Sequence, residues 1–177
     1  MAGIEVRALD RDELDQALDT LVEAFSADPS WQRVIPVRRL VRPLLTRYYR
    51  GCLKDLMPNG NADGAFAGGQ LLGVALWYPP GRRPGGLAGR LVHLFPRRKD
   101  LDGWLLEGIA VDEAGRGKGI GSALLAHRLA GCTETVRLEA TTEASARLYS
   151  RHGFVPELGQ GGGDLRMTRL PNGQARS

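Results

Sequence analysis

The sequence contains few cysteines and no long hydrophobic run. Of its 177 residues only two are cysteine, Cys52 and Cys132, and their spacing is not that of a CxxC motif. Such usage is typical of a reducing compartment, and we expect both to be small buried hydrophobic side chains. No stretch approaches the ~20 apolar residues of a membrane span, and the N-terminal MAGIEVRALDRDELDQ is charged where a secretory signal would be apolar. The sequence therefore predicts a soluble, cytoplasmic protein without a membrane partner.

Lysine is also scarce. Only Lys54, Lys99 and Lys118 are present, so arginine supplies almost all of the positive charge. The formal net charge of +4 favours an anionic cofactor or partner without requiring nucleic acid. The most basic segment, GRRPGGLAGRLVHLFPRRK, lacks interleaved aromatic residues, so we do not expect nucleic acid as a partner. The three histidines have no metal-ligand spacing, and no metal site is predicted.

The chain length fits one domain with a substantial hydrophobic core. We expect a single domain over residues 1–170 and a disordered tail, PNGQARS, over residues 171–177. The segment from Gly81 to Asp100 is rich in glycine, proline and arginine, which makes it a candidate substrate lid.

The N-terminal half predicts a strand, two helices and a hairpin. Asp10 and Glu13 have the spacing of a capping box before a first helix, which we expect Pro29 to end. A second helix, from Val37 to Met57, has one apolar face and contains Pro43, which predicts a kink or a break into two helices. The sequence GAFAGGQLLGVALWYPPG predicts a hairpin with strands 65–67 and 71–78.

The C-terminal half alternates strands and helices. WLLEGIAV, from Trp104 to Val111, is the strongest strand candidate and leads directly into a glycine-rich loop and a helix. TVRLEA, FVPEL and DLRMTRL are predicted as strands, and TEASARLYSRH as a helix that ends at Gly153. The predicted order, β-α-α-β-β-β-α-β-α-β-β, is a mixed α/β fold with no internal repeat.

The glycine-rich loop in VDEAGRGKGIGSALLAHRL predicts an anion site. Glycine lets a backbone approach a ligand closely, and the first amides of a helix are unpaired donors that attract negative charge. The loop is not a Walker A motif, because Lys118 is followed by Gly119 rather than by serine or threonine. It is not a dinucleotide fingerprint either, because Ser122 occupies the place of the third glycine.

The pattern RxxGxG, from Arg116 to Gly121, lies between a strand and a helix and is followed downstream by LYSRHGF. In this order the motifs resemble the GCN5-related N-acetyltransferase (GNAT) superfamily, whose loop binds the pyrophosphate of coenzyme A. The resemblance implies a central mixed, mostly antiparallel β-sheet that is splayed at the acetyl-CoA site and flanked by helices. Flanking segments such as EAFSADPSW and MTRLP are similar to the branch containing puromycin N-acetyltransferase.

Acetyl-CoA is the cosubstrate that this resemblance implies. Amides of the loop and of the following helix suit its pyrophosphate, while the strand before the loop is expected to pair with the pantetheine arm and to polarise the thioester carbonyl. The branch often has asparagine where this chain has Ser145, whose hydroxyl can replace part of that contact. The expected cofactor-binding residues are Ile109, Ala110, Val111, Arg116, Gly117, Lys118, Gly119, Ile120, Gly121, Ser122 and Ser145.

Acetyl transfer to an amine needs a base for the amine and a proton donor for the leaving sulfur. The resemblance places the general acid at Tyr149, although its helical spacing alone is typical of a core aromatic residue. Glu107 and Glu139 are the candidate bases, because each is an acid inside an otherwise apolar strand. By strict alternation Glu107 shares a face with Ile109 and Val111. Either acid could instead bind the acceptor's ammonium group or pair with an arginine.

The acceptor pocket is expected between the two N-terminal helices, the second hairpin strand and the segment after it. Asp28 is a candidate partner for an amine. Aromatic residues are candidates for the lining, although they are more often core residues in a chain of this size. The candidate lining residues are Trp31, Tyr48, Trp77 and Tyr78.

The sequence and the resemblance together predict an acyltransferase that moves an acetyl group from acetyl-CoA to a primary amine of a small molecule. We expect direct attack in a ternary complex, and a monomer or a homodimer. The alternatives are acetylation of a protein lysine or N-terminus, and a coenzyme A-binding module without turnover. A narrow aromatic pocket would favour the small molecule, whereas an open groove lined with acids would favour a protein.

Overall fold

The computed structural model describes residues 3–83, 102–157 and 164–171. Most of the candidate lid, residues 84–100, and residues 172–177 of the expected tail lie outside the described residues. None of the described helices combines the length and apolar character needed to cross a membrane.

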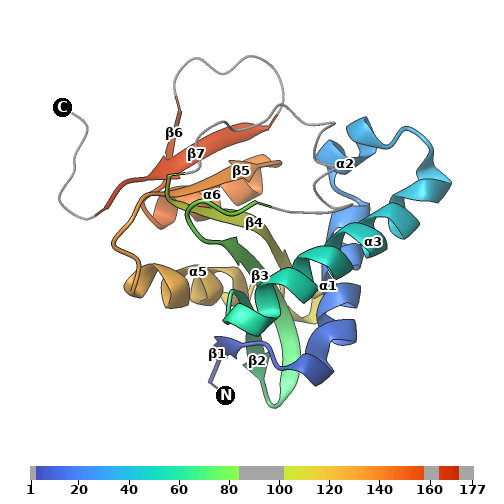
Figure 1. Cartoon of the computed structure of the whole chain (residues 1–177), viewed down its shortest axis with the longest axis horizontal. Helices are drawn as coiled ribbons and strands as arrows, with labels where there is room; N and C mark the ends of the chain where they lie inside the picture. The colour runs from blue at the N-terminus through green and yellow to red at the C-terminus, as the bar shows by residue number, and fades with distance from the viewer. Residues whose placement is uncertain (1–2, 84–101, 158–163, 172–177) are drawn as a thin grey trace.

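The described strands form one seven-stranded sheet in the order β1-β2-β3-β4-β5-β7-β6 (Figure 1). Only β4 and β5 pair in parallel, and the other neighbours are antiparallel, so the predicted mixed, mostly antiparallel sheet is confirmed. The strand bounds are β1 Glu5–Ala8, β2 Ala62–Ala67, β3 Gln70–Tyr78, β4 Trp104–Val111, β5 Val136–Ala140, β6 Val155–Pro156 and β7 Leu165–Arg169.

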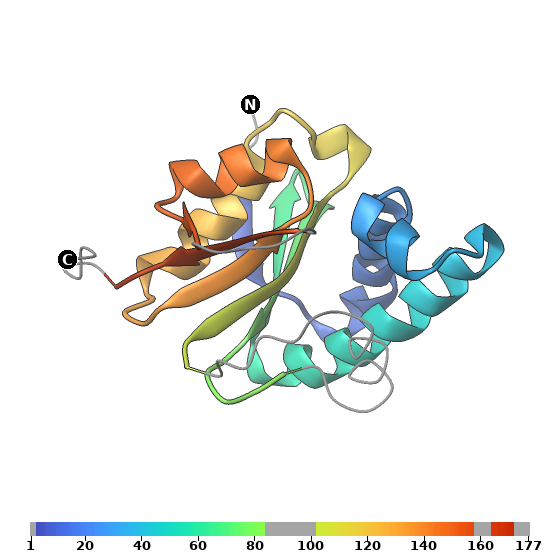
Figure 2. The ribbon, with the colours of Figure 1, turned by 90° about the horizontal axis from the view of Figure 1, so that it is seen from above.

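Helices cover both faces of this sheet (Figure 2). One hydrophobic core lies between the sheet and helices α1 (Leu14–Ser26) and α3 (Arg38–Leu56). A second core lies on the opposite face, beneath α5 (Ile120–Ala130) and α6 (Glu143–Arg151). Because β3 is an interior strand that contributes to both cores, every residue of this strand after Gln70 is buried.

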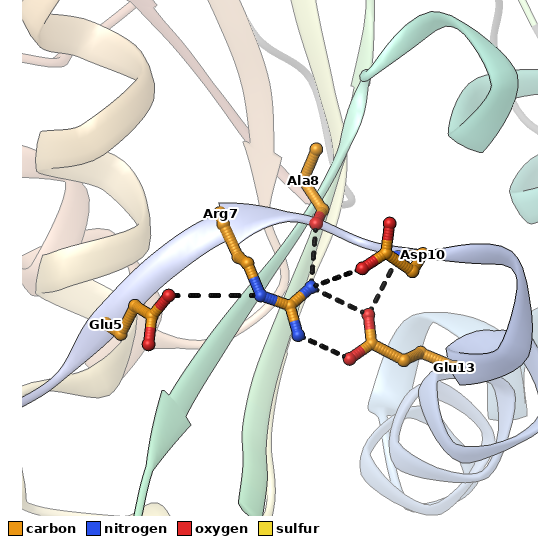
Figure 3. Close-up of polar contacts among 5 residues, drawn as sticks. All are labelled: Glu5, Arg7, Ala8, Asp10 and Glu13. Carbon is orange, nitrogen blue, oxygen red and sulfur yellow. Dashed lines mark hydrogen bonds and ion pairs between the residues drawn. The ribbon is translucent and has the colours of Figure 1, made fainter. Parts of the chain in front are cut away.

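The predicted capping box is present at the N-terminus. The Asp10 amide donates to a Glu13 carboxylate oxygen at 2.7 Å, and the short 3-10 helix η1 (Arg11–Glu13) precedes α1. Arg7 of β1 makes two hydrogen bonds to the Glu13 carboxylate, at 2.6 and 2.9 Å, and also pairs with Glu5 and Asp10 (Figure 3). The hydrogen bond from Arg7 lowers the pKa of Glu13. One arginine thus fixes the start of α1 against the edge of the sheet.

Two expectations about proline need correction. Pro29 does not merely end the first helix: it occupies the first turn of a further helix, α2 (Pro29–Val34), for which Asp28 is the N-cap. A proline is well placed there because the first helical amide has no partner to lose. Pro43 does not divide the second helix, and α3 runs continuously through it. Packing of the long buried face of α3 stabilises the helix by more than the backbone hydrogen bond lost at Pro43 would contribute.

The hairpin between β2 and β3 is confirmed, with its first strand longer than predicted. Gly68 and Gly69 form its two-residue turn with φ of 58° and 80°. Two consecutive positive φ values are those of a type I′ turn, which matches the twist of the flanking strands. On its other edge β3 pairs with β4, the strand that leads into the glycine loop.

Candidate active site

β4 and β5 separate soon after they meet. Their pairing consists of Trp104 with Val136 and Leu105 with Arg137, and beyond Leu105 the described pairs of β4 are with β3. The remaining backbone of β4 therefore has one edge free for a ligand. A cavity of about 1050 Å³ opens beside this edge and extends from the glycine loop to the N-terminal helices.

A β-bulge interrupts β4 at Glu107. Leu106 lies opposite Trp77 and Gly108 lies opposite Leu76, so Glu107 has no partner on β3. A bulge breaks the alternation of a strand and redirects a side chain. The Glu107 side chain accordingly accepts a hydrogen bond from the Tyr48 hydroxyl of α3. The expectation that Glu107 shares a face with Ile109 and Val111 is therefore wrong, because strict alternation does not hold here.

The glycine loop leaves several amides unpaired. Gly117 and Gly119 have φ of 73° and 79°, and Gly119 is the N-cap of α5. A Cβ at either position would meet no described atom within 4 Å, so both glycines border open space. Among the described residues, no backbone acceptor faces the amides of Gly117, Gly119, Ile120, Gly121 and Ser122. These donors and the positive end of the α5 dipole are suited to bind an anion.

The remaining loop residues contribute in other ways. The Lys118 amide donates to the Gly115 carbonyl at 3.2 Å, and Lys118 is outside the described cavity lining, so its amide does not fit the expected phosphate contact. Gly121 lets α5 approach α6, since a Cβ there would lie 3.2 Å from the Leu148 side chain. The Ser122 hydroxyl lies 2.7 Å from His152 Nε2, which joins the beginning of α5 to the end of α6.

Tyr149 lines the same cavity from α6. Its side chain is 5% exposed and packs edge-on against Phe154, with ring centroids 6.0 Å apart. Burial, and to a smaller extent the charge of Asp28, raises the pKa of Tyr149. The phenol therefore stays protonated at neutral pH and is able to donate a proton. Tyr149 is thus a core aromatic residue, as its spacing indicates, and it also lines the cavity, where the resemblance predicts the general acid.

Glu107 and Glu139 both line the cavity, in different electrostatic settings. Burial raises the pKa of Glu107 to about 7, the Tyr48 hydrogen bond opposes this rise, and the nearby charge of Glu139 adds to it. Glu139 pairs with Arg166 of β7 at 3.3 Å. A carboxylate that titrates near neutrality suits proton transfer, whereas one beside an arginine is held as a counter-ion.

Four aromatic side chains form a continuous wall at the other end of the cavity. Phe25 stacks on Tyr49 at 5.1 Å between centroids, Tyr49 meets Tyr48 at 5.0 Å, and Trp31 packs edge-on against Tyr48 at 5.0 Å. Gly108 allows this packing, because a Cβ there would lie 3.2 Å from Phe25. The expected lining residues Trp31 and Tyr48 are thus both in place.

Trp77 and Tyr78 need correction as lining residues. Both are fully buried, Trp77 in the core beneath α5 and Tyr78 in the core beneath α1 and α3, and the described lining of the cavity includes neither. They belong to the interior strand β3, whose two faces are both covered.

Asp28 and Ser145 line the cavity while holding helix ends. Asp28 accepts hydrogen bonds from the Ser30 amide at 2.9 Å and from the Thr141 hydroxyl at 2.6 Å. The Ser145 hydroxyl forms a capping box with Thr142 at the start of α6. The polar atoms of Asp28 and Ser145 therefore stabilise helix ends, although both residues also line the cavity.

A sequence model of the acetyltransferase (GNAT) domain matches residues 67–156, about half of the chain, which includes β3, β4, the glycine loop and α6. The chain belongs to this family. The GNAT acetyltransferases transfer an acetyl group from acetyl-CoA, which is the cosubstrate of this protein as well.

Solved structures agree with this assignment. The protein is similar to a structure from Corynebacterium glutamicum described as histone acetyltransferase HPA2 and related acetyltransferase, with 32% identity, 97% of each chain covered and a TM-score of 0.75. It has the same fold as the PaiA N-acetyltransferase of Thermoplasma acidophilum in complex with coenzyme A, with 18% identity, 95% and 99% coverage and a TM-score of 0.63. A search of curated proteins found no match.

The residues of this GNAT acetyltransferase fit acetyl-CoA. The unpaired amides around Gly119 suit a pyrophosphate, and the free edge of β4 from Glu107 to Val111 suits the amide-bearing pantetheine arm. Ile109, Ala110, Val111, Arg116 and Ser122 all line the cavity, as expected.

Sequence reasoning missed several cavity residues of this GNAT acetyltransferase. Asp164 accepts a hydrogen bond from the Ser30 hydroxyl and pairs with Arg33, which ties α2 to the start of β7. Tyr49 and Thr141 also line the cavity. No local pattern marks such residues, because their role depends on contacts between distant segments. Tyr49 alone had a signal, an aromatic residue next to Tyr48 on an apolar helix face.

Proposed function

We propose that this acetyltransferase moves the acetyl group of acetyl-CoA to the nitrogen of a small primary amine, by direct attack in a ternary complex. The observation that carries the proposal is Glu107, a carboxylate with a pKa near 7 between an aromatic wall and the cofactor edge of β4. A group that titrates near neutral pH can accept a proton from an ammonium and release it again.

In the proposed step, the neutral amine attacks the thioester carbonyl, a nitrogen–carbon bond forms and the carbon–sulfur bond breaks. Glu107 takes the proton that the nitrogen loses, directly or through a water, and the Tyr149 hydroxyl gives a proton to the departing sulfur. Backbone amides on the free edge of β4 are placed to stabilise the carbonyl oxygen as it becomes negative. The phenolate of Tyr149 then recovers a proton from solvent.

The aromatic wall supports a small-molecule acceptor. Phe25, Trp31, Tyr48 and Tyr49 line the cavity, and Tyr48 is hydrogen-bonded to Glu107. An aromatic lining of this kind suits a small organic molecule. We further propose a single domain and a cytoplasmic location, in keeping with the scarcity of cysteine.

The test is release of coenzyme A thiol over a panel of amines with the wild type, Glu107→Gln and Glu139→Gln. The two variants make the same isosteric change on neighbouring strands of one cavity. We expect Glu107→Gln to lower kcat by about 10²-fold or more, while Glu139→Gln retains most of the turnover. The reverse ranking would assign the base to Glu139, and equal turnover of all three proteins would remove both acids from the mechanism.

A protein acceptor is the second candidate, because the Corynebacterium glutamicum structure at 32% identity is described as a histone acetyltransferase. A histone-tail peptide and a free N-terminal peptide belong in the same assay. Acetylation of a peptide with higher kcat/KM than any small amine would favour this candidate. Coenzyme A binding by calorimetry without any thiol release would indicate a binding module.

A further inference from the structure

A serine and a histidine meet where α5 begins. Ser122 lies in the first turn of α5 and lines the cavity, and its amide is one of those with no described backbone acceptor outside the helix. The Ser122 hydroxyl is 2.7 Å from Nε2 of His152, the C-cap of α6. Because His152 is outside the described lining of the cavity, it reaches a bound anion through Ser122.

The Ser122 hydroxyl has a single proton, and His152 decides where that proton points. When Nε2 of His152 is unprotonated, it accepts the hydroxyl proton, and the serine oxygen presents only lone pairs to the cavity. When Nε2 carries a proton, it donates to the serine oxygen, and the hydroxyl is free to donate to an anion. An anion held by the loop amides gains this donor only in the second arrangement.

The surroundings of His152 disfavour its charged form while the site is without an anion. Burial lowers the pKa of His152, and the charges of Arg151 on α6 and Arg169 on β7 lower it further. The negative end of the α6 dipole, at which His152 lies, acts in the opposite direction. Within the described part of the chain no acidic side chain forms an ion pair with His152. A pyrophosphate on the loop would supply that negative charge and favour the imidazolium.

We infer that His152 is a positioning residue for the cosubstrate, which takes up a proton from solvent when the pyrophosphate of coenzyme A binds and turns the Ser122 hydroxyl toward the phosphate. Coenzyme A should therefore bind more tightly where His152 is protonated, and this gain is lost as pH rises past the titration of His152 in the complex. The inference goes beyond the proposed function and depends neither on the acceptor nor on the general base.

The test measures binding of 3′-dephospho-coenzyme A by calorimetry at about pH 5.5 and about pH 8. This probe retains the pyrophosphate, whose charge is constant over that range, and lacks the 3′-phosphate, whose charge is not. His152→Gln is the variant, because a glutamine amide can donate to the Ser122 oxygen and does not titrate. His127→Gln is the matched control, since His127 is an exposed histidine of α5 outside the described lining of the cavity.

The quantity compared is the ratio of the Kd at the higher pH to the Kd at the lower pH. Glu107, whose pKa is about 7, also titrates in this range, but it contributes equally to all three proteins. We expect the ratio to be about fivefold or more larger in the wild type and in His127→Gln than in His152→Gln.

A second measurement follows the histidines directly, by NMR of wild-type protein labelled with ¹⁵N in histidine. The titration of His152 should move to higher pH when the probe binds, and that of His127 should stay in place. In Ser122→Ala the movement at His152 should be smaller, because the hydroxyl that links it to the phosphate is gone.

Equal ratios in the wild type and His152→Gln would overturn the inference, as would a His152 titration that does not move on binding. An undiminished movement in Ser122→Ala would refute the part assigned to the hydroxyl. No amine is present in these measurements, so their failure would leave the proposed acetyl transfer intact, and inactivity towards every amine would leave this inference intact.

Discussion

The hydrogen bond between Tyr48 and Glu107 predicts a shift in the pH dependence of the reaction. Tyr48→Phe removes one hydroxyl from a fully buried side chain and leaves the ring in the aromatic wall. The hydroxyl stabilises the ionised form of Glu107 and so lowers its pKa, whereas burial raises it to about 7. Without the hydroxyl the pKa of Glu107 rises further. Because the base must be deprotonated, the ascending limb of kcat/KM moves to higher pH.

The size of the shift follows from the energy of the lost bond. A hydrogen bond to a charged group contributes about 1.5–3 kcal/mol. One pKa unit corresponds to about 1.4 kcal/mol, so we expect the limb to move up by roughly 1–2 pH units. At pH values well above the new limb the turnover of the variant should approach that of the wild type, since Tyr48 acts through Glu107 and does not take the proton itself.

The assay is kcat/KM against pH for one amine acceptor, together with the carboxyl titration of Glu107 by NMR on protein labelled with ¹³C in glutamate. Tyr78→Phe is the control, since it removes the hydroxyl of another buried tyrosine near the same helix, one outside the described lining of the cavity. A folded Tyr48→Phe protein with an unmoved limb and an unmoved carboxyl titration would refute the reasoning. So would an equal shift in Tyr78→Phe.

Three further predictions concern the acid, the loop and stability. Tyr149→Phe should lower kcat by about 10²-fold with little change in the KM for acetyl-CoA, and unaltered turnover and pH profile would exclude it as the acid. Gly119→Leu and Gly68→Leu both place a side chain at a positive φ, 79° and 58°, and each should lose about 1–2 kcal/mol of unfolding free energy. Only Gly119→Leu should abolish coenzyme A binding by calorimetry, and equal affinities would contradict its role. Glu107→Gln should raise the unfolding free energy at about pH 8 by roughly 3 kcal/mol and change it little at about pH 4. The pKa of Glu107 in the folded wild type, about 7, lies above the unfolded value of 4.5. The wild type therefore loses stability as pH rises between these two values. Urea unfolding of both proteins at the two pH values measures the difference. A higher unfolding free energy of the variant at about pH 4 alone would contradict the prediction.

The cofactor half of the site was predictable because its requirements are local. Gly117 and Gly119 adopt positive φ, which a sequence records as glycine, and the helix start that binds the anion follows at once in the chain. Apart from the short helix α2, the order of the described strands and helices was recovered for the same reason, since each element has its own periodicity and end signals.

The acceptor half depends on tertiary contacts that periodicity does not record. Trp77 and Tyr78 lie in a strand buried on both faces, so alternation cannot assign either to a cavity. Glu107 is redirected by a bulge, and nothing in WLLEGIAV distinguishes a bulged strand from a regular one. Asp28 was expected in the acceptor pocket and does line the cavity, but its role as the N-cap of α2 was missed, because Pro29 was expected to end a helix and not to begin one.

The contacts that tie α2 to distant parts of the chain also set an order of events during synthesis. Asp28 bonds to a residue 113 positions later, and Ser30 to one 134 positions later. At typical translation rates Asp164 emerges roughly 7–27 s after Ser30. The strand, loop and helix of the coenzyme A half are contiguous in the chain, and local contacts of this kind form early. In a nascent chain the side of the cavity at α2 therefore stays open until residues up to Asp164 have been made.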